Sequence, residues 1–127
     1  MQIRVYYEDT DLGGVVYYAN YLKFIERARS ETFFSIGASP IVEGGAFVVR
    51  SVTAEYLKPA RFGDLLEIKS VCTELRGATL TMRQEIFRDD EKLFSADVRL
   101  AFVQNEKPTR IPKDVAKIFD TQKADQH

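Results

Sequence analysis

The sequence predicts an α+β fold in which an antiparallel sheet of about five strands wraps around one long helix. Three observations predict it: one segment has apolar residues at helical spacing, most of the remaining chain alternates as strands do, and the connections are short. Connections of hairpin length imply antiparallel pairing, so the strands after the helix are expected to form a four-stranded meander. A single domain is expected to span residues 1–120.

The chain opens with a segment of β-branched and aromatic residues, Gln2–Glu8, which predicts a strand. A turn-forming stretch with two adjacent glycines follows it. Apolar residues then recur every three or four positions and predict a helix over Ala19–Ile36. Asn20 is the expected N-cap residue, and Gly37 is the expected C-terminal stop.

Four strands are expected after this helix. The first, Phe47–Lys58, is rich in β-branched residues and ends at Pro59, which cannot donate to a ladder. The second and third strands are expected to meet in a tight hairpin at Arg76-Gly77. The last strand, Phe94–Phe102, follows a turn at Asp89-Asp90 and shows the cleanest alternation in the chain.

The C-terminal part is expected to hold one short helix. Pro112 is placed to open it, and its expected apolar face consists of Val115, Ile118 and Phe119. The polar segment 121–127 is expected to be a disordered tail.

Length and charge limit the function. The chain has 127 residues, a mass of 14.5 kDa, and 18 basic against 19 acidic side chains, for a formal net charge of −1. This balance gives no general attraction to nucleic acid or to an anionic membrane. No apolar run approaches the roughly 20 residues that span a bilayer, and the first residues lack the blocks of a signal peptide. We therefore expect a cytoplasmic protein that binds neither nucleic acid nor a membrane.

The scarcity of histidine and cysteine excludes several kinds of site. His127, the last residue, is the single histidine, and Cys72 is the single cysteine. A nucleophile–histidine relay needs an imidazole that is held firmly, and a catalytic zinc site commonly needs more than one. Cys72 is expected to be a buried structural residue. Hydrolytic or acid–base chemistry must therefore use a carboxylate, a tyrosine, a lysine or the backbone.

The candidate site is the segment 7–21, in which carboxylates and two glycines precede the helix. A helix start offers unpaired N–H groups and a partial positive charge, which stabilise an oxyanion. A carboxylate opposite them is able to attack a carbonyl or to activate water, and Val15–Tyr18 are expected to keep the site dry. Acidic residues before a helix also serve as turn formers, so spacing alone leaves both interpretations open. Gly13-Gly14 lacks the following Lys-Ser or Lys-Thr of a phosphate loop.

The same segment resembles the hotdog-fold acyl-CoA thioesterases of the 4-hydroxybenzoyl-CoA thioesterase family, in particular a bacterial branch associated with the Tol-Pal cluster. The resemblance extends from about Arg4 to Val103, and its most specific part consists of residue types at fixed spacing. These are Tyr7-Glu8-Asp9-Thr10-Asp11, Gly14-Val15-Val16-Tyr17, Asn20-Tyr21 and Glu26-Arg27-Ala28-Arg29. The family fold, a long helix wrapped by an antiparallel sheet, agrees with the fold predicted above.

The resemblance implies roles for four residues. Asp11 matches the family's catalytic carboxylate, which acts as nucleophile or as general base. The backbone N–H of Tyr18 matches the donor to the thioester oxygen, at a position where many members of this branch have histidine. Arg76 matches an arginine that binds CoA phosphate, and Arg110 is a second candidate. Both arginines are also open to interpretation as solvated surface residues.

The leading hypothesis is an acyl-CoA thioesterase that needs neither a metal nor an organic cofactor. The alternative is a non-catalytic module that binds acyl-CoA or acyl carrier protein on the same fold. A dehydratase would need the missing histidine, and a pure scaffold role ranks last. The resemblance also implies a homodimer, or a dimer of dimers, with sites between subunits. The acyl group and the choice between CoA and acyl carrier protein stay open.

Overall fold

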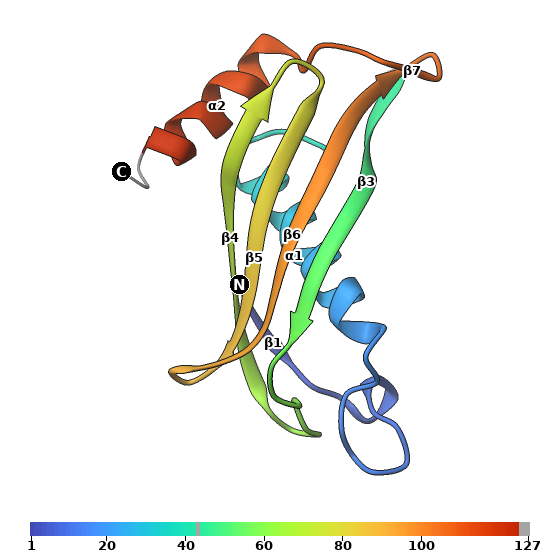
Figure 1. The fold of residues 1–127 in the computed structure, drawn as a ribbon, viewed down its shortest axis with the longest axis vertical. Helices are drawn as coiled ribbons and strands as arrows, with labels where there is room; N and C mark the ends of the chain where they lie inside the picture. The colour runs from blue at the N-terminus through green and yellow to red at the C-terminus, as the bar shows by residue number, and fades with distance from the viewer. Residues whose placement is uncertain (43, 125–127) are drawn as a thin grey trace.

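A curled antiparallel sheet surrounds one long helix, and a shorter helix lies at one end of the sheet (Figure 1). The computed structural model describes residues 1–42 and 44–124, with the backbone alone at 118 and 120–124. Its sheet has seven strands in the order β1-β4-β5-β6-β3-β2, and β7 pairs with β6. The α+β prediction is confirmed.

Four long strands carry the sheet, and three very short ones extend it. The strands are β1 (Gln2–Arg4), β2 (Ile41–Val42), β3 (Gly45–Tyr56), β4 (Leu65–Arg76), β5 (Thr79–Arg88), β6 (Glu91–Gln104) and β7 (Lys107–Pro108). Tight turns join β4 to β5 and β5 to β6, as predicted, and Gly77 and Asp89 take positive φ angles of 58° and 53° there. The inward side chains of β4, β5 and β6 form much of the core.

The predicted four-stranded meander is wrong for β3. Strands β4, β5 and β6 do form a meander, but β3 pairs with β6, from Gly45 opposite Gln104 to Tyr56 opposite Phe94. The eight-residue crossing segment 57–64, which joins β3 to β4, explains the difference. It is too long for a tight hairpin and contains Pro59, so the chain passes across one end of the sheet instead of turning back on β3.

Helix α1 (Asn20–Ser35) lies in the hollow of the sheet, as the apolar spacing predicts. Its buried stripe consists of Tyr21, Phe24, Ile25, Ala28 and Phe33.

Both ends of α1 were predicted, with different outcomes. Gly37 ends the helix with φ 74°, and the N–H groups of Gly37 and Ala38 bond the carbonyls of Phe34 and Phe33, the pattern of a Schellman motif. Asn20 is not the N-cap residue, because Ala19 occupies that position without a side-chain cap. The amide of Asn20 is used elsewhere, since its Nδ2 donates to the Asp9 carbonyl at 2.9 Å.

The predicted strand Gln2–Glu8 is shorter in the structure. Strand β1 ends at Arg4, and a 3₁₀ turn over Tyr7–Asp9 follows. The Asp9 carboxylate accepts the Tyr6 N–H at 2.8 Å, which turns the chain away from the sheet before the alternation is complete. Tyr7 is 78% exposed as a result.

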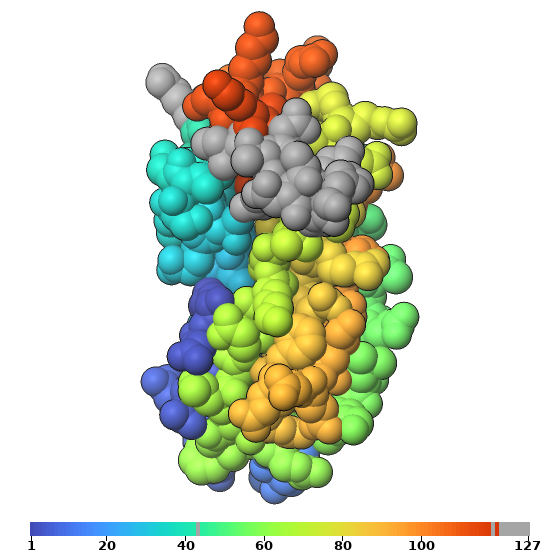
Figure 2. Space-filling model, turned by 90° about the vertical axis from the view of Figure 1, so that its left-hand side faces the viewer, coloured from blue at the N-terminus to red at the C-terminus, as the bar shows by residue number. Residues whose placement is uncertain are grey.

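Helix α2 (Lys113–Ala124) follows Pro112, whose carbonyl accepts the Ala116 N–H at 2.9 Å. Val115 and Phe119 are buried, as expected, whereas the side chain of Ile118 lies outside the described part. The helix includes residues 121–124, which the sequence pattern assigns to the polar tail, and 125–127 lie outside the described residues. Seen from the side, α2 covers one end of the molecule and the N-terminal segment lies toward the other (Figure 2).

Candidate active site

The Asp11 loop, residues 9–19, leads into α1 at the end of the sheet opposite α2 (Figure 1). It folds back on itself through two backbone bonds, from the Asp11 N–H to the Val15 carbonyl at 2.9 Å and from the Gly14 N–H to the Asp11 carbonyl at 3.1 Å. Gly14 has φ 76°, a conformation that glycine adopts without strain. The loop is therefore a defined turn that holds both backbone groups of Asp11.

Asp9 closes this loop and is a structural residue. Its carbonyl accepts the Tyr17 N–H at 3.1 Å and the Asn20 side-chain amide at 2.9 Å. One oxygen of its carboxylate, Oδ2, accepts the Tyr6 N–H. The turn-forming interpretation of the acidic segment is thus right for Asp9.

Asp11 differs from Asp9 in exposure, because its side chain is exposed whereas that of Asp9 is half-buried. Its Oδ1 accepts the Gly13 N–H at 2.9 Å, which orients the group. Within residues 1–42 and 44–124, no donor reaches its Oδ2, and the side chain is exposed. A fixed carboxylate with one open oxygen has the geometry of a nucleophile or a general base.

Tyr18 lies at the start of α1 and has an open N–H group. The first backbone donors of the helix, Asn20 and Tyr21, bond the carbonyls of Tyr17 and Tyr18 in tight turns. The Tyr18 N–H itself meets no acceptor among the described residues. Its ring contacts that of Tyr17, with centroids 4.7 Å apart, and a hydrogen bond between the two side chains raises the pKa of Tyr17. An N–H at this position is a suitable oxyanion donor.

The crossing segment ties the Asp11 loop to the core. The Ala60 carbonyl accepts the Val16 N–H, and the Gly14 carbonyl accepts the Phe62 N–H, both at 2.9 Å. The Ala60 N–H in turn donates to the buried hydroxyl of Tyr21 on α1 at 2.9 Å. Sequence reasoning missed this role of Ala60, which lies within the span of the resemblance but outside its most specific motifs.

The expectation that Val15–Tyr18 keep the site dry is wrong for a single chain. Only Val16 is buried, while Tyr17 and Tyr18 are 48% and 62% exposed and Leu12 is fully exposed. These exposed apolar side chains need a further surface to exclude water from the loop.

Arg76 and Arg110 lie together, but away from Asp11 and Tyr18. Arg76 ends β4, is highly exposed, and has its nearest carboxylate contact with Glu74 at 3.9 Å. The Ile111 N–H donates to the Gly77 carbonyl at 3.0 Å, which places the loop of Arg110 beside the β4–β5 hairpin. This hairpin and the Asp11 loop lie at opposite ends of the sheet (Figure 1). A single chain therefore does not bring the two pairs of predicted residues together.

A cavity of about 380 Å³ lies between α1 and the β2–β3 side of the sheet, and no residue of the Asp11 loop lines it. Arg29 contributes to it, and its Nη1 donates to the Gln84 Oε1 at 2.9 Å. Gln84, which is fully buried, also bonds the Ile25 carbonyl and Ser70. Burial lowers the pKa of Arg29. The polar Gln84 among the inward apolar positions of β5 was the sequence signal for this cluster.

Metal-binding clusters and membrane-spanning helices are absent from the described residues. Within 1–42 and 44–124, no group of three or more His, Cys, Asp or Glu side chains is arranged to hold a metal ion, and no helix is long and apolar enough to cross a membrane. Cys72 is fully buried on β4, which agrees with a structural role.

Comparisons with known proteins show the family of the chain. A family model described as the thioesterase superfamily matches residues 13–95. The acyl-CoA thioesterase YbgC of Helicobacter pylori is 44% identical over 124 residues, which cover 89% of this chain and 93% of that protein. The acyl-CoA thioester hydrolase YbgC of Escherichia coli is also 44% identical, with 92% of each chain covered. A crystal structure of a probable thioesterase from Bartonella henselae matches with a TM-score of 0.83 and 41% identity, over 88% of this chain and 97% of that one.

The bond between Ala60 and Tyr21 predicts a measurable loss of stability. Tyr21→Phe leaves the buried Ala60 N–H without an acceptor, which should lower the free energy of unfolding by about 1–3 kcal/mol. Tyr56→Phe is the matched control, because its hydroxyl bonds the Tyr18 carbonyl at 3.2 Å in an exposed position. Its loss should stay below about 1 kcal/mol. Urea unfolding of both variants checks this, and equal losses would show that the Ala60 contact is not special.

Proposed function

The chain belongs to the thioesterase superfamily and is a thioester hydrolase, and on this premise we propose that it cleaves an acyl-CoA to the free acid and CoA with Asp11 as the catalytic carboxylate. The observation that carries the proposal is the pairing of an oriented carboxylate, open at Oδ2, with an open N–H at the start of α1. Cytoplasmic acyl-CoA is the substrate we propose, with acyl carrier protein as the other carrier to be tested.

Asp11 has two routes to the products. In one, its Oδ2 attacks the thioester carbonyl, the C–S bond breaks, CoA leaves as the thiolate, and water then hydrolyses the mixed anhydride. In the other, Oδ2 accepts a proton from a water molecule whose oxygen attacks the carbonyl, and the protonated carboxyl returns the proton to the departing sulfur. Both routes need the open oxygen of Asp11 and leave no group on the enzyme at the end.

The Tyr18 N–H is the proposed donor to the carbonyl oxygen of the thioester. In either route the carbonyl oxygen becomes negatively charged as the carbon becomes tetrahedral. A backbone N–H at a helix start stabilises this charge by a hydrogen bond and by the partial positive charge of the helix end. Because the donor is the backbone, tyrosine in place of histidine at position 18 leaves this contact available.

We propose that two copies of the chain complete the site. Strand β2 pairs only with Gly45 and Ala46, so the edge of β3 from Val48 to Tyr56 has no partner strand among the described residues. Exposed apolar side chains line this edge and the adjacent face of α1: Leu22, Val48, Val49 and Val52. Such an edge favours pairing with another strand.

Antiparallel pairing of two copies would bring the two separated pairs of predicted residues close to each other. Two β3 edges related by a two-fold axis run in opposite directions. The Asp11 end of one copy then lies toward the Arg76 and Arg110 end of its partner. These arginines are our candidates for binding the CoA phosphates, and the partner surface is our candidate for covering the exposed apolar residues of the loop.

Asp11→Asn tests the catalytic assignment. Asparagine keeps the acceptor for the Gly13 N–H but cannot attack or accept a proton, so kcat should fall by about 10²–10⁴-fold with folding preserved. Thiol release from a panel of short, long and aromatic acyl-CoA esters and acyl carrier protein thioesters is the measurement, and circular dichroism checks the fold.

Glu8→Gln is the matched control for Asp11→Asn, since Glu8 is an exposed carboxylate of the same segment. It should keep near-normal turnover. A fully active Asp11→Asn enzyme would contradict the assignment. No thiol release from any ester by the unaltered protein would favour the non-catalytic binding module, which ligand titration would then detect.

Val52→Glu tests the pairing of two copies. Val52 is 40% exposed at the free β3 edge, so a carboxylate there should shift the protein toward a single copy and lower turnover. Val71→Glu is the control, because Val71 is 38% exposed but lies on β4, opposite Arg83 and away from this edge. Sedimentation velocity measures both, and an unaltered assembly for Val52→Glu would contradict the proposed interface.

A further inference from the structure

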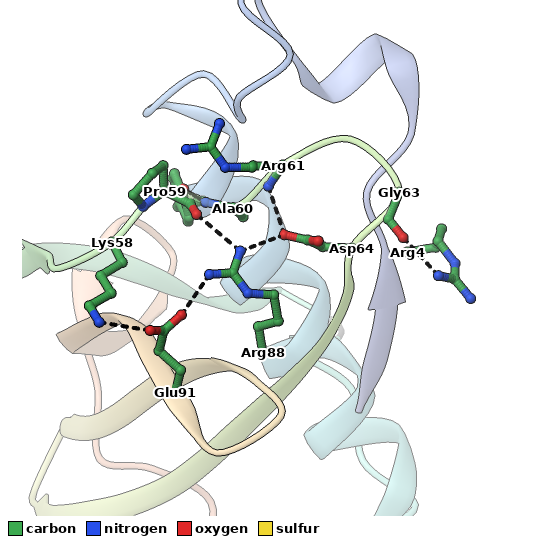
Figure 3. A network of polar contacts seen from close by, with 10 residues as sticks. Arg4, Lys58, Pro59, Ala60, Arg61, Gly63, Asp64, Arg88 and Glu91 are labelled. Carbon is green, nitrogen blue, oxygen red and sulfur yellow. Dashed lines mark hydrogen bonds and ion pairs between the residues drawn. The ribbon is translucent and has the colours of Figure 1, made fainter.

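We propose that Arg88 is a positioning residue for Asp11, acting through the crossing segment that lies between them. The inference rests on the proposed function, because it concerns the carboxylate assigned there. Arg88 is the last residue of β5 and has no place in the sequence motif, yet it holds the crossing segment, which bonds the Asp11 loop at Gly14 and Val16 (Figure 3).

Arg88 bonds two residues of the crossing segment and one residue of β6. Its Nη1 donates to the Asp64 carboxylate at 2.8 Å and to the Pro59 carbonyl at 3.3 Å. Its Nη2 donates to the Glu91 carboxylate at 2.6 Å, and Lys58 bonds the other oxygen of Glu91 at 2.7 Å. The hydrogen bonds from Lys58 and Arg88 lower the pKa of Glu91, so this carboxylate stays ionised at a lower pH than an ordinary glutamate.

Arg88 fixes two residues of the crossing segment directly, Pro59 and Asp64, and a third, Arg61, through Asp64. Arg88 holds the Pro59 carbonyl directly, and Asp64, which it also holds, accepts the Arg61 N–H at 2.8 Å. Ala60 and Phe62, on either side of Arg61, bond the Asp11 loop instead. Ala60 accepts from the loop and Phe62 donates to it, so one face of the segment is anchored while the other forms the backing of the loop.

The last link reaches the backbone of Asp11. The Phe62 N–H bonds the Gly14 carbonyl, and the Ala60 carbonyl bonds the Val16 N–H. Gly14, which makes the first of these contacts, also donates its N–H to the Asp11 carbonyl. Val15, which lies between Gly14 and Val16, accepts the Asp11 N–H. A shift of the crossing segment therefore moves the residues that hold Asp11 on both of its backbone groups.

The charges make Arg88 hard to replace. Asp64 and Arg88 are 20% and 28% exposed, so their ion pair is shielded more than the other pairs on this sheet. A planar guanidinium reaches two carboxylates and a carbonyl at once, whereas a lysine ammonium is a single point. Arg4 adds a separate bond to the Gly63 carbonyl at 2.8 Å. This bond, the Ala60–Tyr21 bond and the backbone bonds of the segment remain when Arg88 is removed, so its fold is not lost outright.

Arg88→Met in the full-length enzyme tests the proposal with two readouts. Methionine fills similar space without donors, so hydrogen exchange at the Val16 and Phe62 amides should become at least about 10-fold faster as the segment loosens. The kcat for acyl-CoA hydrolysis should fall by about 10–100-fold with KM changed little, because the carboxylate is misplaced while substrate contacts remain. Arg88→Lys should recover part of both effects.

Arg83→Met is the matched control. Arg83 lies on the same strand and pairs with Asp97 on β6 through two bonds of 3.1 Å, but it does not touch the crossing segment. This variant should change neither exchange at the loop nor kcat. If Arg88→Met does not fold, Asp64→Asn, which removes the charge with the same shape, should give the same two effects.

The readouts separate this proposal from the proposed function. Exchange is measured without substrate, so it decides whether Arg88 holds the loop even if Asp11→Asn proves active. Exchange at Val16 and Phe62 equal to that in Arg83→Met would overturn the proposal, as would faster exchange with unchanged kcat. A lower kcat with unchanged exchange would also overturn it, because Arg88 would then act by another route.

Discussion

The backbone of Ala60 is the point at which the core of this protein and its candidate active site meet. Its N–H is buried against the Tyr21 hydroxyl, and its carbonyl is bound by Val16. Buried backbone groups have to be paired, so the position of α1 in the sheet dictates where the crossing segment lies, and the segment dictates where the Asp11 loop lies. The loop has little apolar contact of its own and depends on this chain of bonds for its shape.

A second constraint is the incomplete wrapping of α1. The sheet covers one side of the helix but leaves the β3 edge and the cavity beside Arg29 open. The same topology separates the two ends of the sheet, with the Asp11 loop at one end and the β4–β5 hairpin, which begins after Arg76, at the other. Pairing of two copies through β3 addresses both features at once, because it covers the open edge and joins opposite ends. The edge strand and the divided site thus favour the same assembly.

Sequence reasoning succeeded where the information is local. The stripe of α1, its end at Gly37 and the position of the Asp11 loop follow from spacing, backbone conformation and residue type over a few positions. It failed where the structure depends on contacts between segments that are far apart in the sequence. Alternation identifies β3 as a strand but does not say that its neighbour is β6. Asn20 was predicted to cap the helix, whereas its amide bonds the Asp9 carbonyl of the loop. The roles of Ala60 and Arg88 are contacts between remote positions, so only the folded chain displays them.

Subunit complementation tests the central claim most directly, that Asp11 of one copy works with the arginines of another. Asp11→Asn and Arg76→Glu are each expected to be impaired, and Arg76 is exposed enough for the substitution to leave the fold intact. When the two variants are produced together, a mixed pair holds one site with both substitutions and one with neither. We expect more thiol release from the mixture than from the two variants added separately. Activity no greater than that sum, with mixed pairs demonstrated by mass spectrometry, would contradict a site shared between copies.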